Sequence, residues 1–229
     1  MNYLQLANAV LSRLNETQLT ASTFPTVTSG FSSEVKDAIN RSIDDINTYQ
    51  YNWPWNLTYR NETLVVKKSR YSLPADYKIV DWDSFRIVRD TTQSVDGHKL
   101  SQISYGEYLK QYSYQEDASD QEGSMPYYVW KGQGDEWGVS PMPDKAYVVR
   151  YEYFALPTDL SVYSDTPTIP PKFHHVIVTG AMYYAYMFRE NTQAAQLERD
   201  KFLKEIESMR EINVNYTPHL VSTKIVGRG

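Results

Sequence analysis

The chain has 229 residues, of which 41% are hydrophobic and 22% charged, so it can bury a sizeable core. A formal net charge of −5 gives no overall field that would attract nucleic acid, and the absence of cysteine excludes disulfides, thiolate nucleophiles and cysteine-ligated zinc. Neither a signal peptide nor a membrane span is expected. Tyrosine is abundant, with 20 residues, which suits either the margins of a β-rich core or a contact surface.

Helical spacing of apolar residues predicts two helices at the start of the chain. The first carries Tyr3, Ala7, Val10, Leu11 and Leu14 on one face. The second carries Val35, Ala38, Ile39, Ile43 and Ile46, with Ser32 or Ser33 as its N-cap. Asn52-Trp53-Pro54-Trp55 ends this second helix, because proline cannot continue the hydrogen-bond ladder.

From Glu62 onward the apolar period changes to two, which predicts strands. The expected strands cover residues 63–67, 79–80, 85–89, 127–131, 137–140 and 147–154. Asp96-Gly97 marks a turn and Ser104–Tyr112 a short helix. The acidic segment Gln115–Gly123 lacks the ligand spacing of an EF-hand and is expected to be a solvated surface loop.

Two further helices are predicted after the rigid Ile169-Pro170-Pro171 connection. Pro171 lies near the start of the third helix, where a missing N–H is tolerated. Its residues Gly180, Ala181 and Ala185 are small enough to let another helix approach closely. The fourth helix is expected over Thr192–Ile212, with Phe202, Ile206 and Met209 on its inner side.

This order of elements predicts an α+β fold, in which the N- and C-terminal helices form one helical bundle. An antiparallel β-rich module would be inserted in the bundle, and an extended C-terminal tail would follow it. We expect residues 1–56 and 158–213 to form the bundle domain, residues 57–157 the β module and residues 214–229 the C-terminal arm.

A succession of short motifs points to a known family. The motifs are Ser72-Leu73-Pro74-Ala75-Asp76-Tyr77, then Trp137-Gly138-Val139-Ser140-Pro141-Met142-Pro143-Asp144, Val149-Arg150-Tyr151-Glu152-Tyr153, Leu156-Pro157 and Ile169-Pro170-Pro171-Lys172-Phe173-His174. In order and spacing they resemble the head-to-tail adaptor (connector) proteins of short-tailed bacteriophages, the group that includes tail tubular protein A. The resemblance covers about residues 30–212.

The resemblance implies a structural virion protein that forms a ring, usually of twelve copies. Such a ring joins the portal to the tail nozzle or tail tube, contacts tail fibres, and helps retain or pass the genome, so DNA is only passing cargo. The protein would be assembled in the host cytoplasm and reside in the neck or tail of the virion. A C-terminal extension that reaches the portal or a neighbouring subunit would use Tyr216, Pro218, His219, Leu220, Val221, Lys224, Ile225 and Arg228.

No catalytic residue, cofactor or metal is expected. Asp81 with Asp83, and Asp135 with Glu136, are the acid pairs that glycan cleavage could use, but turn carboxylates normally satisfy backbone donors. The adjacent His174 and His175 point about 100° apart on a helix and cannot easily share one metal.

Aromatic residues keep one alternative function open. Trp53, Trp55, Tyr127, Tyr128, Trp130 and Trp137 form either the core of the β module, which we favour, or an exposed stacking platform. An exposed platform together with the acid pairs would fit a glycan-binding or cell-wall-hydrolysing virion component. The adaptor remains the preferred interpretation, because no catalytic constellation accompanies these residues.

Overall fold

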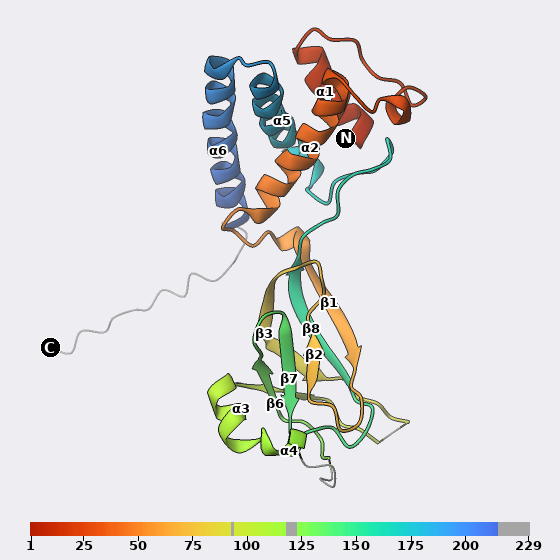
Figure 1. The fold of residues 1–229 in the computed structure, drawn as a ribbon, viewed down its shortest axis with the longest axis vertical. Coiled ribbons are helices and arrows are strands. Elements are labelled where there is room, and N and C mark those ends of the chain that lie inside the picture. Colours follow the sequence, from red (N-terminus) through yellow and green to blue (C-terminus); the bar gives the residue numbers. More distant parts are fainter. Residues whose placement is uncertain (93, 118–122, 215–229) are drawn as a thin grey trace, which may run out of the picture. The chain divides into compact units, whose positions relative to one another are not determined.

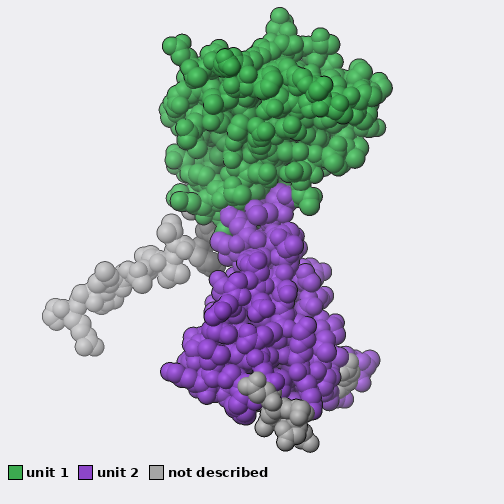
Figure 2. Space-filling model, viewed as in Figure 1, with its two compact units in different colours: residues 1–55, 158–229 green, residues 56–157 purple. Residues whose placement is uncertain are grey.

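The computed structural model describes residues 1–92, 94–117 and 123–214. The chain divides into two compact units (Figures 1 and 2). Unit 1 combines Met1–Trp55 with the residues from Thr158 onward, and unit 2 is the intervening segment Asn56–Pro157. Helices make up unit 1 and strands dominate unit 2, so the predicted α+β class is confirmed.

Unit 1 begins with two helices whose ends are set by local chemistry. Helix α1 spans Tyr3–Arg13 and starts with a capping box, in which Asn2 and Gln5 satisfy each other's backbone N–H groups. A short 3₁₀ turn, η1, follows at Phe24–Thr26. Helix α2 spans Phe31–Thr48 and is preceded by Gly30 with a φ of 78°. The serine cap predicted for this helix is wrong, because the Gly30 carbonyl already accepts from the Ser33 and Glu34 backbone N–H groups.

Two later helices complete unit 1. The 3₁₀ turn η3, Pro171–Phe173, leads directly into helix α5, His174–Phe188, as the proline at its start predicts. Helix α6 runs over Thr192–Val214, two residues beyond its predicted end. Side chains from all four α-helices of unit 1 share one core, which includes Leu6, Ile39, Val176, Ile206 and the buried Trp53.

Helix α5 approaches both α2 and α6 closely at Gly180. The Ser42 hydroxyl of α2 donates a 3.0 Å hydrogen bond to the Ile177 carbonyl one turn before this glycine. A Cβ added at Gly180 would collide with that hydroxyl and lie 2.7 Å from Cε2 of Phe202 in α6. Helix α5 therefore contacts both neighbours at a position where only a hydrogen atom fits.

Unit 2 contains two four-stranded sheets in its described residues. Sheet A has the order β1-β8-β3-β4, formed by Leu57–Thr63, Val148–Ala155, Tyr77–Ile87 and His98–Lys99. Sheet B has the order β2-β7-β6-β5, formed by Arg70–Ser72, Glu136–Ser140, Tyr128–Lys131 and Ser101–Ile103. Remaining elements are the 3₁₀ turn η2 (Pro54–Asn56) at the unit boundary and helices α3 (Tyr105–Gln111) and α4 (Tyr114–Asp117).

The inner faces of the two sheets enclose the core of unit 2. Phe85 of sheet A stacks on Tyr151 with ring centroids 4.5 Å apart and meets Trp137 of sheet B at 5.1 Å. The outer face of sheet B is covered by α3, where Tyr108 stacks on the buried Trp130 at 3.9 Å. Ser104 and Glu107 form a capping box at the start of α3, which fixes the helix where the sequence predicts it.

One strand predicted in unit 2 is wrong. Residues 63–67 are not a strand, because β1 ends at Thr63 and Lys67 adopts a φ of 60° in a turn closed by Lys68 N–H and the Val65 carbonyl. Val65 and Val66 read as strand residues in sequence yet lie exposed in this turn. The module is rich in antiparallel pairs, as predicted: β5 pairs with β6 in parallel, and the other strand pairs are antiparallel.

Candidate functional site

A β-bulge in β3 shapes the outer face of sheet A. Pairing of β3 with β8 shifts between Asp81 and Arg86, so four residues of β3 oppose a single residue of β8. Within the bulge, the Glu152 backbone N–H donates to Ser84 Oγ at 2.8 Å, and that hydroxyl donates to the Asp81 carbonyl at 2.6 Å. The bulge is thus fixed by a side-chain hydroxyl that replaces a missing ladder carbonyl.

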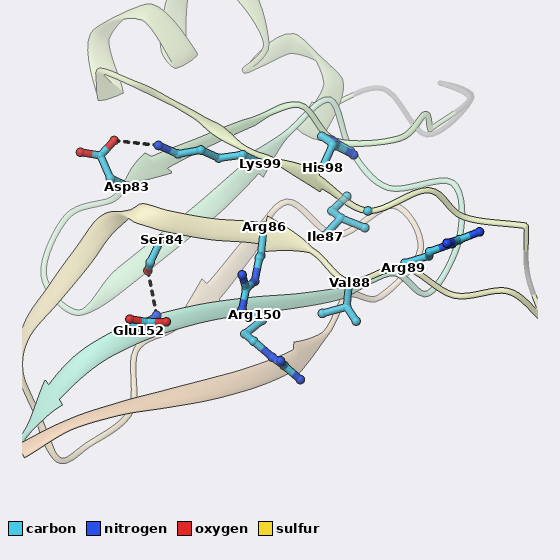
Figure 3. A pocket seen from close by; sticks show the side chains of 11 residues that line it. Asp83, Ser84, Arg86, Ile87, Val88, Arg89, His98, Lys99, Arg150 and Glu152 are labelled. Atoms are coloured by element: carbon cyan, nitrogen blue, oxygen red, sulfur yellow. Dashed lines mark hydrogen bonds and ion pairs between the residues drawn. The ribbon is translucent and has the colours of Figure 1, made fainter.

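Next to the bulge lies a hollow of about 580 Å³ (Figure 3). Its charged lining residues come from β3, β4, β8 and the turn after β3; they are Asp83, Arg86, Arg89, Lys99, Arg150 and Glu152. Among these residues, Lys99 Nζ and Asp83 Oδ1 form an exposed ion pair at 3.5 Å. Within the described chain, Arg86 and Arg89 have no carboxylate partner at ion-pair distance.

Two arginines of this hollow occupy opposite positions on adjacent strands. Arg86 of β3 lies directly opposite Arg150 of β8 in the strand register. Arg150 is held in place by a 2.8 Å hydrogen bond from its Nε to Asn61 Oδ1 and by the Tyr59 ring, 4.9 Å from its guanidinium carbon. Like charges on opposite strand positions are unfavourable for a sheet.

Apolar residues continue this face of sheet A toward the other end of β8. Leu57 and Ile79 both pair with Phe154, and each is 45% exposed. Tyr59 is 59% exposed beside Arg150. The outer face thus joins an arginine-rich end to an apolar end, and tyrosine with arginine is the composition enriched in protein contact surfaces.

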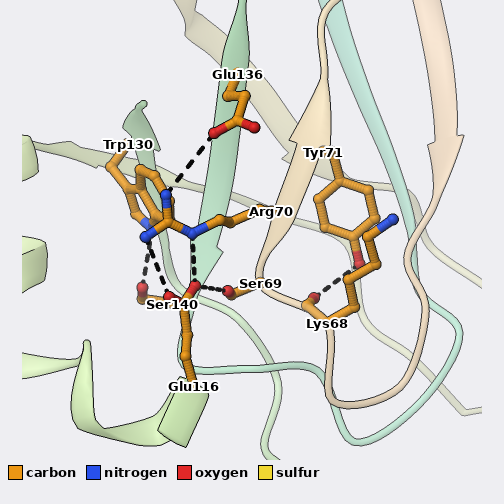
Figure 4. Close-up of polar contacts among 8 residues, drawn as sticks. All are labelled: Lys68, Ser69, Arg70, Tyr71, Glu116, Trp130, Glu136 and Ser140. Carbon is orange, nitrogen blue, oxygen red and sulfur yellow. Dashed lines mark hydrogen bonds and ion pairs between the residues drawn. The ribbon is translucent and has the colours of Figure 1, made fainter. Parts of the chain in front are cut away.

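A second polar cluster surrounds Arg70 on sheet B (Figure 4). The Arg70 guanidinium donates to both carboxylate oxygens of Glu116, at 2.9 and 3.1 Å, and approaches Glu136 at 3.7 Å. It also lies over the Trp130 ring, 5.1 Å from the centroid, and Glu116 accepts a further hydrogen bond from Ser69. This cluster attaches the segment after α3 to the sheet, so we assign it a structural role.

The carboxylate of Glu116 gives unit 2 an acid-sensitive contact. Burial opposes its ionisation, but the hydrogen bonds from Arg70 and Ser69 outweigh burial and hold the pKa of Glu116 below its usual value of 4.5. A group whose pKa is lowered by folding stabilises the protein above its unfolded pKa and loses that effect as the pH falls through its folded pKa. The contact should therefore weaken below about pH 4.5.

We expect Glu116→Gln to lower the free energy of unfolding at pH 7 by about 1–3 kcal/mol, because the hydrogen-bonded ion pair is lost. The difference from wild type should shrink between pH 7 and pH 3, because the stabilisation by the wild-type carboxylate decreases as the pH falls below 4.5, its unfolded pKa, toward its lower folded pKa. Urea denaturation at both pH values measures this. Glu207→Gln, on the exposed side of α6, is the control and should change stability little at either pH. An equal Glu116→Gln effect at pH 7 and pH 3 would contradict the prediction.

The sequence-derived acid pairs each serve local structure. Asp81 Oδ1 accepts from the Asp83 backbone N–H at 3.0 Å inside the bulge. Asp135 accepts a hydrogen bond from the Tyr77 hydroxyl, and this contact raises the pKa of Tyr77. Glu136 lies beside Arg70. Carboxylates in turns normally accept hydrogen bonds from nearby donors, and these contacts are of that kind. They provide no observation in favour of glycan cleavage.

His174 is part of the packing of unit 1. It is buried, its Nε2 hydrogen-bonds with the Ile169 carbonyl at 2.9 Å, and burial lowers its pKa, which favours the neutral ring. Over residues 1–92, 94–117 and 123–214, no group of three or more His, Asp or Glu side chains is arranged to hold a metal ion. No helix of these residues is long and apolar enough to cross a membrane.

The sequence-derived aromatic group does not form a single cluster. Trp53 and Trp55 stack at 4.7 Å in unit 1, so assigning them to the core of the β module is wrong. Trp130 and Trp137 are fully buried in unit 2, as the core interpretation requires, whereas Tyr127 is 54% exposed. The partner-binding residues expected at positions 216, 218–221, 224, 225 and 228 lie outside the described residues.

Comparison of the sequence with protein-family models identifies the chain as a bacteriophage adaptor protein. The model of the SU10 adaptor protein family matches residues 1–222, so the chain belongs to this family. Searching curated proteins gave no match. The resemblance to phage head-to-tail adaptors is confirmed, and membership implies a structural, non-enzymatic protein of the virion neck or tail.

Proposed function

We propose that the chain is a ring-forming head-to-tail adaptor that joins the portal to the tail nozzle and helps retain or pass the genome. The family match over residues 1–222 is the observation that carries this proposal. Copies would associate side by side through a heterologous contact that closes into a ring, with twelve copies as the expected number. Portal and nozzle or tail tube proteins, and tail fibres, are the proposed partners, and host cytoplasm the place of assembly.

Unit 1 offers a surface suited to contact between copies. On α6, Leu197 is 70% exposed and Leu203 is 41% exposed. Leu197 borders a shallow groove of about 500 Å³ that also includes Lys201, Lys204 and Glu205. An apolar side chain beside both signs of charge suits a second copy better than it suits water, because its burial would add about 1.5–3 kcal/mol per contact.

In this proposal the parts of the chain have separate tasks. Residues 1–56 and 158–213 serve as the helical bundle domain that packs against neighbouring copies, and residues 57–157 serve as the β module. Residues 214–229 serve as the arm that reaches the portal or a neighbouring copy. The mixture of β-prone and basic residues in Tyr216–Arg228 supports a binding role for that arm.

The test mixes the purified chain with portal rings and, separately, nozzle rings of the same phage, followed by electron microscopy and mass measurement. Wild type should add a closed ring of copies to the portal. Leu197→Glu should leave incomplete rings, because a charge would be buried between copies. Gln193→Glu adds the same charge to an exposed position of α6 without removing an apolar side chain, and should assemble as wild type does.

The two results that count against the proposal are distinct. Failure of wild type to bind either ring would overturn the adaptor function. Complete rings with Leu197→Glu, whose helical content is checked by circular dichroism, would overturn only the assignment of α6 as the contact between copies.

A further inference from the structure

We infer that the hollow of sheet A, bounded by the β3 bulge, β4 and β8, docks a carboxylate-rich segment of a partner protein, with Arg86 and Arg150 as its anchors. The identity of that partner as a neighbouring protein of the virion neck rests on the proposed adaptor function. The preference of the hollow for carboxylates rests only on the residues that line it, so it can be tested apart from the identity of the partner.

Charge is the first reason. Arg86 and Arg150 are direct cross-strand neighbours, an arrangement that is unfavourable until an anion lies between them or beside them. Arg89 and Lys99 line the same hollow (Figure 3). This concentration of basic side chains occurs in a chain whose net charge is −5, so general composition does not explain it.

Preorganisation is the second reason. Asn61 and Tyr59 fix the guanidinium of Arg150 before any ligand arrives. The hydrogen bonds of Ser84 fix the bulge that precedes Arg86. A held guanidinium loses less conformational entropy on pairing with a carboxylate, whose geometry matches its fork of N–H donors.

The surroundings favour a protein segment over nucleic acid. The neighbouring exposed residues Leu57 and Ile79 are apolar and offer nothing to a phosphate backbone. A hollow of about 580 Å³ accommodates a few side chains, whereas a duplex could only rest on its rim. Alternating acidic and apolar side chains of a peptide would match both ends of this face.

The experiment titrates a fluorescein-labelled deca-glutamate peptide, and separately a labelled 20-base-pair DNA duplex, into the full chain and records anisotropy. Wild type should bind the peptide, with affinity that falls as salt rises. Arg86→Glu should weaken binding about tenfold or more, because repulsion replaces pairing. Arg86 is exposed and has no ion pair in the described chain, so this change should not unfold the protein. Lys145→Glu, an equal charge change at an exposed site outside the hollow, is the control.

Each outcome decides a separate question. Peptide binding that Arg86→Glu weakens and Lys145→Glu preserves supports the inference. Absence of peptide binding to wild type, or equal weakening by the two variants, overturns it. Duplex binding that depends on Arg86, without peptide binding, would identify a nucleic-acid site instead. Repeating the variants with portal and nozzle rings tests the neck partner: failure of wild type to bind either ring would reject the adaptor function while leaving the peptide result standing.

Discussion

Replacing Gly180 by alanine is expected to lower the free energy of unfolding by about 1–3 kcal/mol, the usual cost of overpacking a core. The added methyl group would collide with the Ser42 hydroxyl and approach the Phe202 ring to within 2.7 Å. Ser42 can rotate away only by giving up its hydrogen bond to the Ile177 carbonyl in a buried setting. Chemical denaturation followed by circular dichroism measures the change.

A matched glycine separates this collision from the general effect of alanine in a helix. Gly106 lies in α3 with open space around its hydrogen atom, so Gly106→Ala should be neutral or slightly stabilising. A Ser42→Ala background should reduce the cost of Gly180→Ala, because one of the two obstacles is then gone. Equal effects of alanine at Gly180 and Gly106 would show that the helices are not in close contact at this position.

The positions of the helices are the most predictable part of this fold, because their signals are local, although α2 begins after Gly30 and not after the expected serine cap. The capping box of Ser104 and Glu107 and the proline at the start of η3 each set a helix from residues within one turn. In contrast, Asp81–Ser84 interrupts the alternation of apolar residues and divides β3 into two predicted strands. The structure shows one strand with a bulge, because the stabilising bond to Ser84 comes from Glu152, 68 residues away.

The hollow could not be predicted from the sequence for the same reason. Nothing near Arg86 in the chain indicates that Arg150 lies opposite, since the register of β3 and β8 is set by buried side chains such as Ile87 and Val149. The sequence likewise predicts a solvated loop around Glu116, whereas this carboxylate binds Arg70, 46 residues away. Local sequence patterns predict the helices and the fold class. The hollow of sheet A depends instead on strand pairing between residues far apart in the chain, which such patterns do not show.

Bulges and unpaired charges cost stability, and the rest of unit 2 has to compensate for them. Sheet B does so through aromatic packing, in which Tyr108 and Arg70 both lie against Trp130. Trp130 in turn lies over Gly138, its direct partner in the β6–β7 register. The close approach of the Trp130 indole to Gly138 makes this glycine a sensitive position of sheet B.

Gly138→Ala is accordingly expected to destabilise the protein by about 3 kcal/mol, at the upper end of the range for overpacking. The new methyl group would overlap several atoms of the Trp130 indole and lie 2.6 Å from its Cη2. The indole has no free direction to move, because it is fully buried, stacked by Tyr108 and hydrogen-bonded through Nε1 to Ser140 Oγ at 3.1 Å. Urea denaturation of this variant and of Gly106→Ala gives the comparison.

The Trp130→Leu background tests whether the indole is the cause. Leucine lacks the ring that covers Gly138, so alanine at this position should cost much less there than in wild type, and the two changes should be strongly non-additive. Additive effects would mean that the flexibility of the Gly138 backbone, and not the overlying indole, requires glycine. Because Arg70 also lies over this indole, Gly138→Ala should weaken the Glu116 contact as well and reduce the difference in stability between pH 7 and pH 3.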